Sequence, residues 1–115
     1  MNINIITAPD LLFNQTQSIC LIEPTVEIKK QLENQLVNVD YPINIYLYEK
    51  NTNDLKWLLS VVNMVDMTIL DTESLGPNVY PYISYILSLP NVWYKSNTDW
   101  GLINKNRFYD FPPLN

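Results

Sequence analysis

The amino-acid sequence has no histidine, one cysteine and two glycines, and each shortage excludes a class of site. Without histidine, the chain has no Ser-His-Asp or Cys-His catalytic group, no HExxH motif and no histidine-ligated zinc. A single cysteine, Cys20, gives no internal disulfide, zinc ribbon or Cys-X-X-Cys redox motif. Gly76 and Gly101 are too few for GxGxxG and lack the spacing of a P-loop.

Charge is also scarce, because charged residues make up only 17% of the chain. There are 7 basic against 12 acidic residues, a net charge of −5. A protein that binds a phosphate backbone needs the opposite sign, so we expect no direct nucleic-acid ligand. The low charge favours a surface that is partly covered by a partner protein. The many asparagines, isoleucines and tyrosines are typical of AT-rich genomes, such as those of phages and low-GC bacteria.

Long apolar segments and targeting signals are missing as well. No run approaches the roughly 18 apolar residues of a membrane helix, and residues 1–7 lack the basic region of a signal peptide. We therefore expect a cytoplasmic protein, in the host cytoplasm if a phage encodes it, with no membrane partner. The chain has 115 residues, enough for one domain over residues 1–95, and residues 96–115 form an arm that docks on this domain or on a partner.

Short apolar runs alternate with helical patterns, which is typical of β/α units around a parallel sheet. We predict an α/β fold with a short parallel sheet of about four strands, an N-terminal edge strand or hairpin, three helices and an aromatic C-terminal arm. The predicted strands are residues 18–22, 43–48, 67–70 and 92–95, with residues 2–7 at the edge and residues 11–14 as a second short strand. The predicted helices begin at Thr25, at Asn53 (as a cap) and at Pro81.

The helix predicted over residues 54–65 is apolar on most sides, which indicates burial on two sides or an oligomer interface. Trp57, Val61 and Met64 share one face of it, and we predict that something other than the helix's own sheet covers this face. The arm supplies the remaining predicted interface residues, which are Trp100, Phe108, Tyr109 and Phe111.

Four acidic residues follow predicted strands, where ligands bind in parallel α/β sheets: Glu23, Glu49, Asp71 and Glu73. Converging carboxylates suit Mg²⁺ or general acid/base chemistry, so Glu23, Asp71 and Glu73 are the alternative catalytic or metal-binding set. Solvated strand ends and helix caps are the other interpretation. Tyr82 and Tyr85 are candidates for stacking on a nucleobase, or for packing against the arm.

Two families share parts of this layout. Glu23 followed by Asp71-x-Glu73 resembles the acidic layout of Toprim-type nuclease and primase domains, although Pro24 stands where those domains usually have glycine. Residues 54–92 resemble nucleoside 2-deoxyribosyltransferases, which are Rossmann-like, through Asp66-Met-Thr-Ile-Leu-Asp71 and a loop with Gly76, followed by a helix with Tyr85 and the segment Pro90-Asn91-Val92. That family's nucleophilic glutamate would fall near Pro81 or Tyr82, so this resemblance implies a chain that has lost the chemistry.

We therefore predict a non-enzymatic interaction or assembly module, phage-encoded if the codon bias reflects its source, that uses no cofactor. It would act as a homo-oligomer or bound to a larger protein. The alternative is a small nucleoside- or Mg-handling enzyme, deoxyribosyltransferase-like or Toprim-like, that uses the strand-end carboxylates. Whether Glu23, Asp71 and Glu73 converge in a pocket distinguishes the two.

Overall fold

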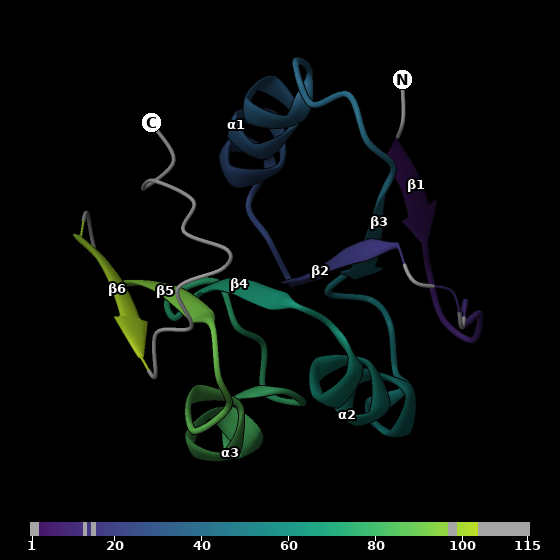
Figure 1. Ribbon diagram of the computed structural model, residues 1–115. Helices are drawn as coiled ribbons and strands as arrows, with labels where there is room; N and C mark the ends of the chain where they lie inside the picture. The colour runs from purple at the N-terminus through teal and green to yellow at the C-terminus, as the bar shows by residue number, and fades with distance from the viewer. Residues whose placement is uncertain (1–2, 13, 15, 97–98, 104–115) are drawn as a thin grey trace.

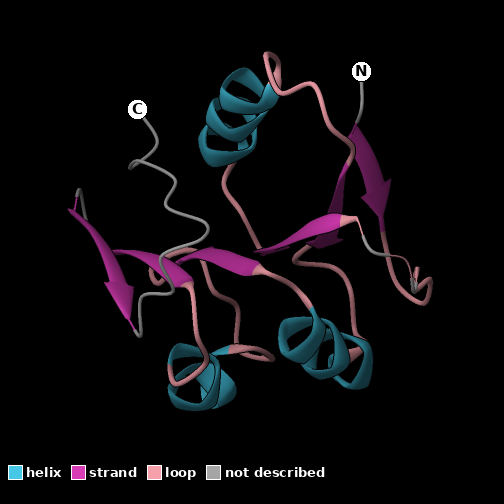
Figure 2. Ribbon diagram, in the orientation of Figure 1, coloured by secondary structure: helices cyan, strands magenta, loops and turns pink. Residues whose placement is uncertain are grey.

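The computed structural model of the chain describes residues 3–12, 14, 16–96 and 99–103. These residues form a mixed α/β fold in which one helix covers one face of a sheet and two helices cover the other (Figures 1 and 2). In chain order, the elements are β1 (Ile3–Ile6), β2 (Gln17–Ile22), α1 (Val26–Leu36), β3 (Ile43–Tyr48), α2 (Leu55–Met64), β4 (Met67–Asp71), the 3-10 turn η1 (Tyr80–Tyr82), α3 (Ile83–Leu87), β5 (Val92–Ser96) and β6 (Asp99–Ile103).

The sheet has six strands in the order β1-β3-β2-β4-β5-β6. Each neighbouring pair from β1 to β5 is parallel, whereas β6 runs antiparallel to β5. We predicted about four strands and an N-terminal edge strand, whereas the sheet has six, because residues 99–103 at the start of the proposed arm form β6. Phe108, Tyr109 and Phe111, the other aromatic residues of the arm, lie outside the described residues.

Side-chain caps fix where the first two helices begin. The Thr25 hydroxyl accepts a hydrogen bond from the backbone N–H of Ile28 at 3.1 Å, as predicted for the start of α1. The cap of α2 is Asp54 instead of Asn53, and its carboxylate accepts from the backbone N–H of Trp57 at 3.1 Å. Among the described residues, no helix has the length and apolar character needed to cross a membrane.

The second short strand predicted over residues 11–14 does not form at Leu11, Leu12 or Asn14. The hydroxyl of Tyr46 instead bonds both backbone groups of Leu12, accepting from its N–H at 3.2 Å and donating to its carbonyl at 3.0 Å. A side chain of β3 therefore satisfies the polar groups that a hairpin partner would have satisfied.

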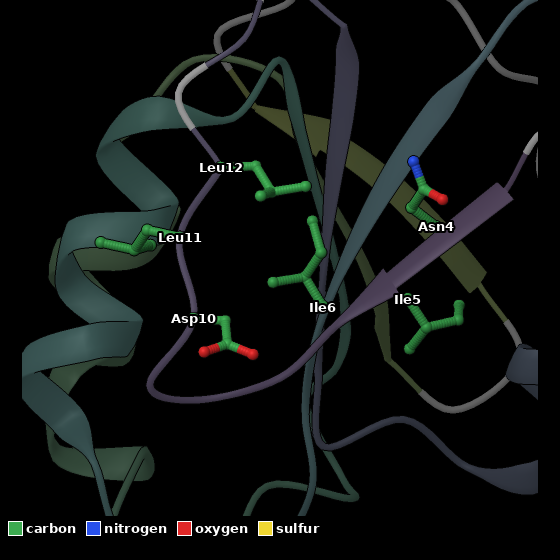
Figure 3. A pocket seen from close by; sticks show the side chains of 6 residues that line it. All are labelled: Asn4, Ile5, Ile6, Asp10, Leu11 and Leu12. Atoms are coloured by element: carbon green, nitrogen blue, oxygen red, sulfur yellow. The ribbon is translucent and has the colours of Figure 1, made fainter.

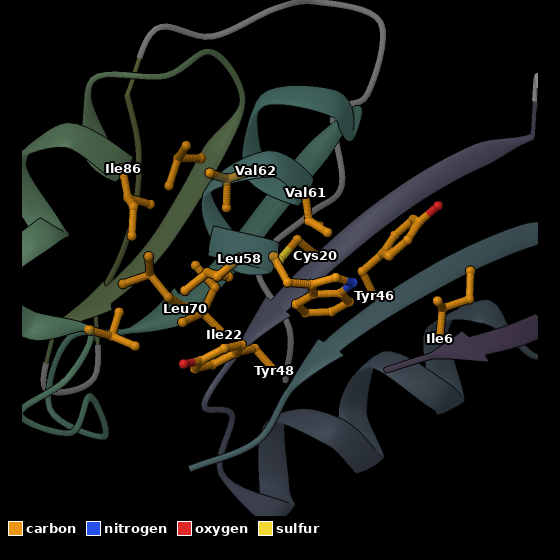
Figure 4. Close-up of a cluster of buried hydrophobic side chains, with 13 residues drawn as sticks. Ile6, Cys20, Ile22, Tyr46, Tyr48, Leu58, Val61, Val62, Leu70 and Ile86 are labelled. Atoms are coloured by element: carbon orange, nitrogen blue, oxygen red, sulfur yellow. The ribbon is translucent and has the colours of Figure 1, made fainter. Parts of the chain in front are cut away.

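Two apolar clusters pack on the two faces of the sheet. One joins α1 to β2, β3 and β4 through residues such as Ile28, Leu32 and Ile45. The other packs α2 and α3 against the opposite face (Figure 4). It contains both Tyr46 and Tyr48.

Trp57 and Val61, two of the predicted interface residues, belong to this second cluster. Trp57 is only 5% exposed and Val61 is fully buried. The Trp57 ring stacks on Tyr48 with centroids 6.2 Å apart, and its Nε1 donates to the carbonyl of Asp10 at 2.7 Å. The connection between β1 and β2, which is not part of the sheet, therefore covers part of this side chain, together with Tyr48 of β3.

Candidate functional site

The switch point of the sheet lies between β2 and β4. The chain passes from β2 through α1 to β3 on one side, and then returns through α2 to β4 on the other side of β2. In open α/β sheets, ligands bind outside the carboxyl ends of the strands at this point. Glu23 follows β2 and Asp71 ends β4, so both are placed at the edge where a ligand site is expected.

The carboxylate of Glu23 is directed into the protein at this point. Glu23 is 2% exposed, and its Oε1 accepts a hydrogen bond from the backbone N–H of Gly76 at 2.5 Å. Its backbone has a φ of 42°, in the left-handed region that costs energy for a residue with a side chain. A Cβ added to Gly76 would lie 3.3 Å from Glu23 Oε2. The glycine therefore allows the loop after β4 to approach the carboxylate closely.

Two further hydrogen bonds hold the same loop. The Ser74 hydroxyl lies 2.8 Å from the carbonyl oxygen of Glu23 and 3.1 Å from that of Asp71, so it connects the ends of β2 and β4. The Asp71 carboxylate accepts from the backbone N–H of Glu73 at 2.9 Å, which is a short turn of the kind that aspartate favours. The loop after β4 is thus the hydrogen-bond partner of the polar groups of Glu23 and Asp71 at the switch point.

The predicted acidic residues are therefore not assembled as a set. Glu23 is buried, Asp71 is half-buried and Glu73 is exposed. Glu49, at the end of β3, pairs instead with Lys29 of α1 at 3.4 Å. Within the part of the chain that the structure describes, no group of three or more acidic or cysteine side chains is arranged to hold a metal ion.

Asp66 and Asp71, the two aspartates of the deoxyribosyltransferase resemblance, lie at opposite ends of β4. The carboxylate of Asp66 accepts from the backbone N–H of Ser18 at 2.9 Å, at the amino end of β2. Five residues of extended chain separate the two aspartates by about 16 Å. They cannot act on one small substrate in this arrangement.

Burial raises the pKa of two further ionisable side chains, one in β2 and one in β3. Burial raises the pKa of the Cys20 thiol far above its usual value. Burial also raises the pKa of Tyr48, and the negative charge of Glu23 adds to this rise. A neutral, fully buried thiol is a poor nucleophile, so Cys20 has the structural role that its position within an apolar strand predicts.

The remaining predicted site residues, three aromatic side chains and one methionine, lie in three separate settings. Tyr82 and Tyr85 are exposed, and the Tyr85 hydroxyl lies 3.0 Å from the side-chain oxygen of Asn63. Trp100 is partly buried against the cluster on the α1 face, with the Lys95 ammonium 5.9 Å from its ring centroid. Met64 of α2 is half-buried. These positions leave the roles of Tyr82, Tyr85, Trp100 and Met64 as predictions.

A groove beside β1 was not expected from the sequence. It has a volume of about 460 Å³, and we call it the β1 groove (Figure 3); its lining residues are Asn4, Ile5, Ile6, Asp10, Leu11 and Leu12. In Figure 3, the segment with Asp10, Leu11 and Leu12 runs alongside β1, and Ile6 points towards Leu12. The alternation of residues 2–7 did identify β1 as an edge strand, which was the available signal.

Comparisons of the chain with protein-family models, with curated proteins and with solved structures gave no match. The functional argument therefore depends on geometry.

Proposed function

We propose that this protein is a non-enzymatic interaction module, which binds a protein partner and performs no chemistry at its switch point. The hydrogen bond between Glu23 and Gly76 carries the proposal. It places the best-situated carboxylate inside the fold, in contact with a backbone N–H of the same chain. A general base or metal ligand must instead reach a substrate or an ion.

The other strand-end carboxylates support the same interpretation. Asp71 caps the turn at Glu73, and Glu49 forms an ion pair with Lys29. The non-catalytic interpretation of these residues was that they are solvated strand ends with local hydrogen bonds. An exposed ion pair of this kind contributes about 0.2–1 kcal/mol to stability, which is a structural and not a chemical use.

Thermal unfolding in the presence of MgCl₂ and of a set of nucleosides tests the proposal. A ligand that binds only the native state raises the melting temperature, so the proposal predicts no rise for the wild-type protein with either probe. Asp71→Asn should behave as the wild type does in every condition. A rise in melting temperature that Glu23→Gln or Asp71→Asn abolishes would contradict the proposal and favour the enzymatic alternative.

A native mass spectrum of the purified protein gives a second, independent measurement. The proposal predicts a chain free of any bound nucleoside or divalent ion. A stoichiometric adduct with the mass of a nucleoside or a metal ion, lost in Glu23→Gln, would contradict it.

A further inference from the structure

Resting on the proposed function, we infer that the β1 groove binds an extended, positively charged segment of a partner protein, which adds to the sheet beside β1. The first reason is the position of β1. Among the strands that the structure describes, it is the outermost on its side of the sheet and pairs with β3 alone. An outermost strand presents backbone N–H and C=O groups that another strand can pair with.

The second reason is the composition of the groove. Ile5 is 55% exposed and Leu12 is 41% exposed, so large apolar side chains flank an available backbone. Strand addition uses this combination, because backbone hydrogen bonds give affinity while pockets for alternate side chains give specificity. The groove volume of about 460 Å³ is within the ordinary range for a ligand site.

The third reason is charge. Asp10 is the one ionisable residue among the described residues that line the groove, and it is exposed. Its carboxylate has no hydrogen-bond or ion-pair partner within the described part of the chain, and only its backbone groups are engaged. An incoming lysine or arginine would therefore find a carboxylate that is not already neutralised.

Charge argues against a second copy as the occupant, and topology argues against the chain's own C-terminal segment. A second copy would bring another Asp10 and another net charge of −5 to the same contact, so like charges would oppose the pairing. The chain's own residues 104–115 follow β6, at the opposite edge of the sheet from β1. Residues 104–115 carry Lys105, Arg107 and Asp110, a net charge of +1, so their charge would suit Asp10, and the test below therefore includes their deletion.

The groove itself is held rigidly, which favours binding without a large ordering cost. Tyr46 of β3 bonds both backbone groups of Leu12, and Trp57 of α2 bonds the carbonyl of Asp10. The segment opposite β1 is therefore anchored to the core at two points, so Asp10 and Leu12 can be changed at their side chains while their backbone contacts remain.

The test uses a fluorescently labelled peptide of about six residues, a usual strand length, in which valine and threonine alternate and one end carries lysine. One control peptide has glutamate in place of lysine, and a second has proline at its centre, which removes a backbone donor. The inference predicts saturable binding of the lysine peptide to the full chain at low ionic strength. Chemical-shift changes should be confined to the amides of Asn4, Ile5, Ile6, Leu11 and Leu12.

Charge reversal then tests the role of Asp10. Asp10→Lys should weaken binding of the lysine peptide by about fivefold and improve that of the glutamate peptide, within the range of exposed charge pairs. Asp99→Lys, an equal charge change at an exposed residue of β6, should leave both affinities unchanged. Leu12→Ser should weaken binding of both peptides, whereas Val37→Ser, at another exposed apolar residue, should not.

Several outcomes would overturn the inference. These are equal binding of the proline peptide, no effect of Asp10→Lys, shift changes away from the groove, or no binding of any peptide. A dimer in sedimentation that Leu12→Ser dissociates would assign the groove to a second copy. Binding that appears only when residues 104–115 are deleted would assign it to the chain's own C-terminal segment. Each result is independent of the ligand tests at Glu23, so the inference can fail while the proposed function stands.

Discussion

The switch point and the β1 groove each contain a carboxylate, but it is buried at the switch point and exposed in the groove. At the switch point, a carboxylate is buried and accepts from a backbone N–H of its own chain. In the groove, the Asp10 carboxylate is exposed and unpaired within the described residues, beside exposed apolar side chains. The comparison teaches that the position favoured by the topology is used for stability in this chain. The surface that we propose for binding lies at the sheet edge instead.

The largest expected effect is on the free energy of unfolding, and it tests whether Trp57 of α2 belongs to the core or to an interface. Trp57→Ala should lower the free energy of unfolding by about 3–5 kcal/mol, because it removes a large buried ring and leaves a cavity. Urea unfolding measures this loss, and Tyr80→Ala, at a 58% exposed side chain, should cost less than about 0.5 kcal/mol. A Trp57→Ala protein of wild-type stability would mean that this side chain is covered by a partner and not by its own fold.

The next effect concerns the carboxylate at the switch point. Glu23→Ala should cost about 1–3 kcal/mol, because it leaves the backbone N–H of Gly76 without its acceptor. Glu49→Ala, which removes only an exposed ion pair, should cost about 0.2–1 kcal/mol. Denaturant unfolding of both variants gives the comparison. Equal losses would show that Glu23 is as dispensable as a surface carboxylate, and would weaken the contrast between the two regions.

A substitution at Gly101 tests whether β6 packs against β5 at the sheet edge opposite β1. A Cβ at this position would lie 2.5 Å from a ring carbon of Tyr94, so Gly101→Ala forces the ring to move and should cost about 1 kcal/mol or more. Tyr94→Ala should restore tolerance to this change, which a double-mutant cycle measures. If the two substitutions are additive, Tyr94 does not pack over Gly101 and β6 is not held at this edge as described.

We expect the smallest effect on stability at Cys20, together with a clear difference in thiol reactivity between the folded and the unfolded chain. Burial raises the pKa of its thiol, so the folded chain should react with a thiol reagent at pH 8 far more slowly than the urea-unfolded chain. Because the folded pKa lies above the unfolded value, this thiol stabilises the fold fully below pH of about 8.5, and the contribution declines as pH rises further. Rapid labelling of folded protein would place the thiol at the surface.

The sequence predicted well the strands that are continuous apolar runs and the helix that begins at a side-chain cap. Strand β3 spans Ile43–Tyr48 as predicted, and β2 begins one residue before the predicted strand. Helix α1 begins after Thr25 because the threonine hydroxyl accepts from Ile28 within the same turn. In each case the determining contacts are close in sequence, so the pattern carries the information.

The errors occurred where distant contacts decide the outcome. Residues 99–103 show no strand period, yet they pair with β5, and Gly101 leaves space for Tyr94. For Trp57 the sequence did not indicate which segment covers the ring, because the hydrogen bond from its Nε1 goes to Asp10, 47 residues away. The carboxylate of Glu23 was placed at the correct end of the sheet, but its bond to Gly76 spans 53 residues. No local pattern reveals such pairings.

Hydrogen exchange at the amide of Gly76 tests the central claim most directly. If the carboxylate of Glu23 is committed to this N–H, the amide exchanges much more slowly than in an unstructured chain. That protection should be lost in Glu23→Ala while the amide of Ile69, within β4, stays protected. Exchange of the Gly76 amide at the unstructured rate in the wild-type protein would contradict the account, because Glu23 would then be free to serve a ligand.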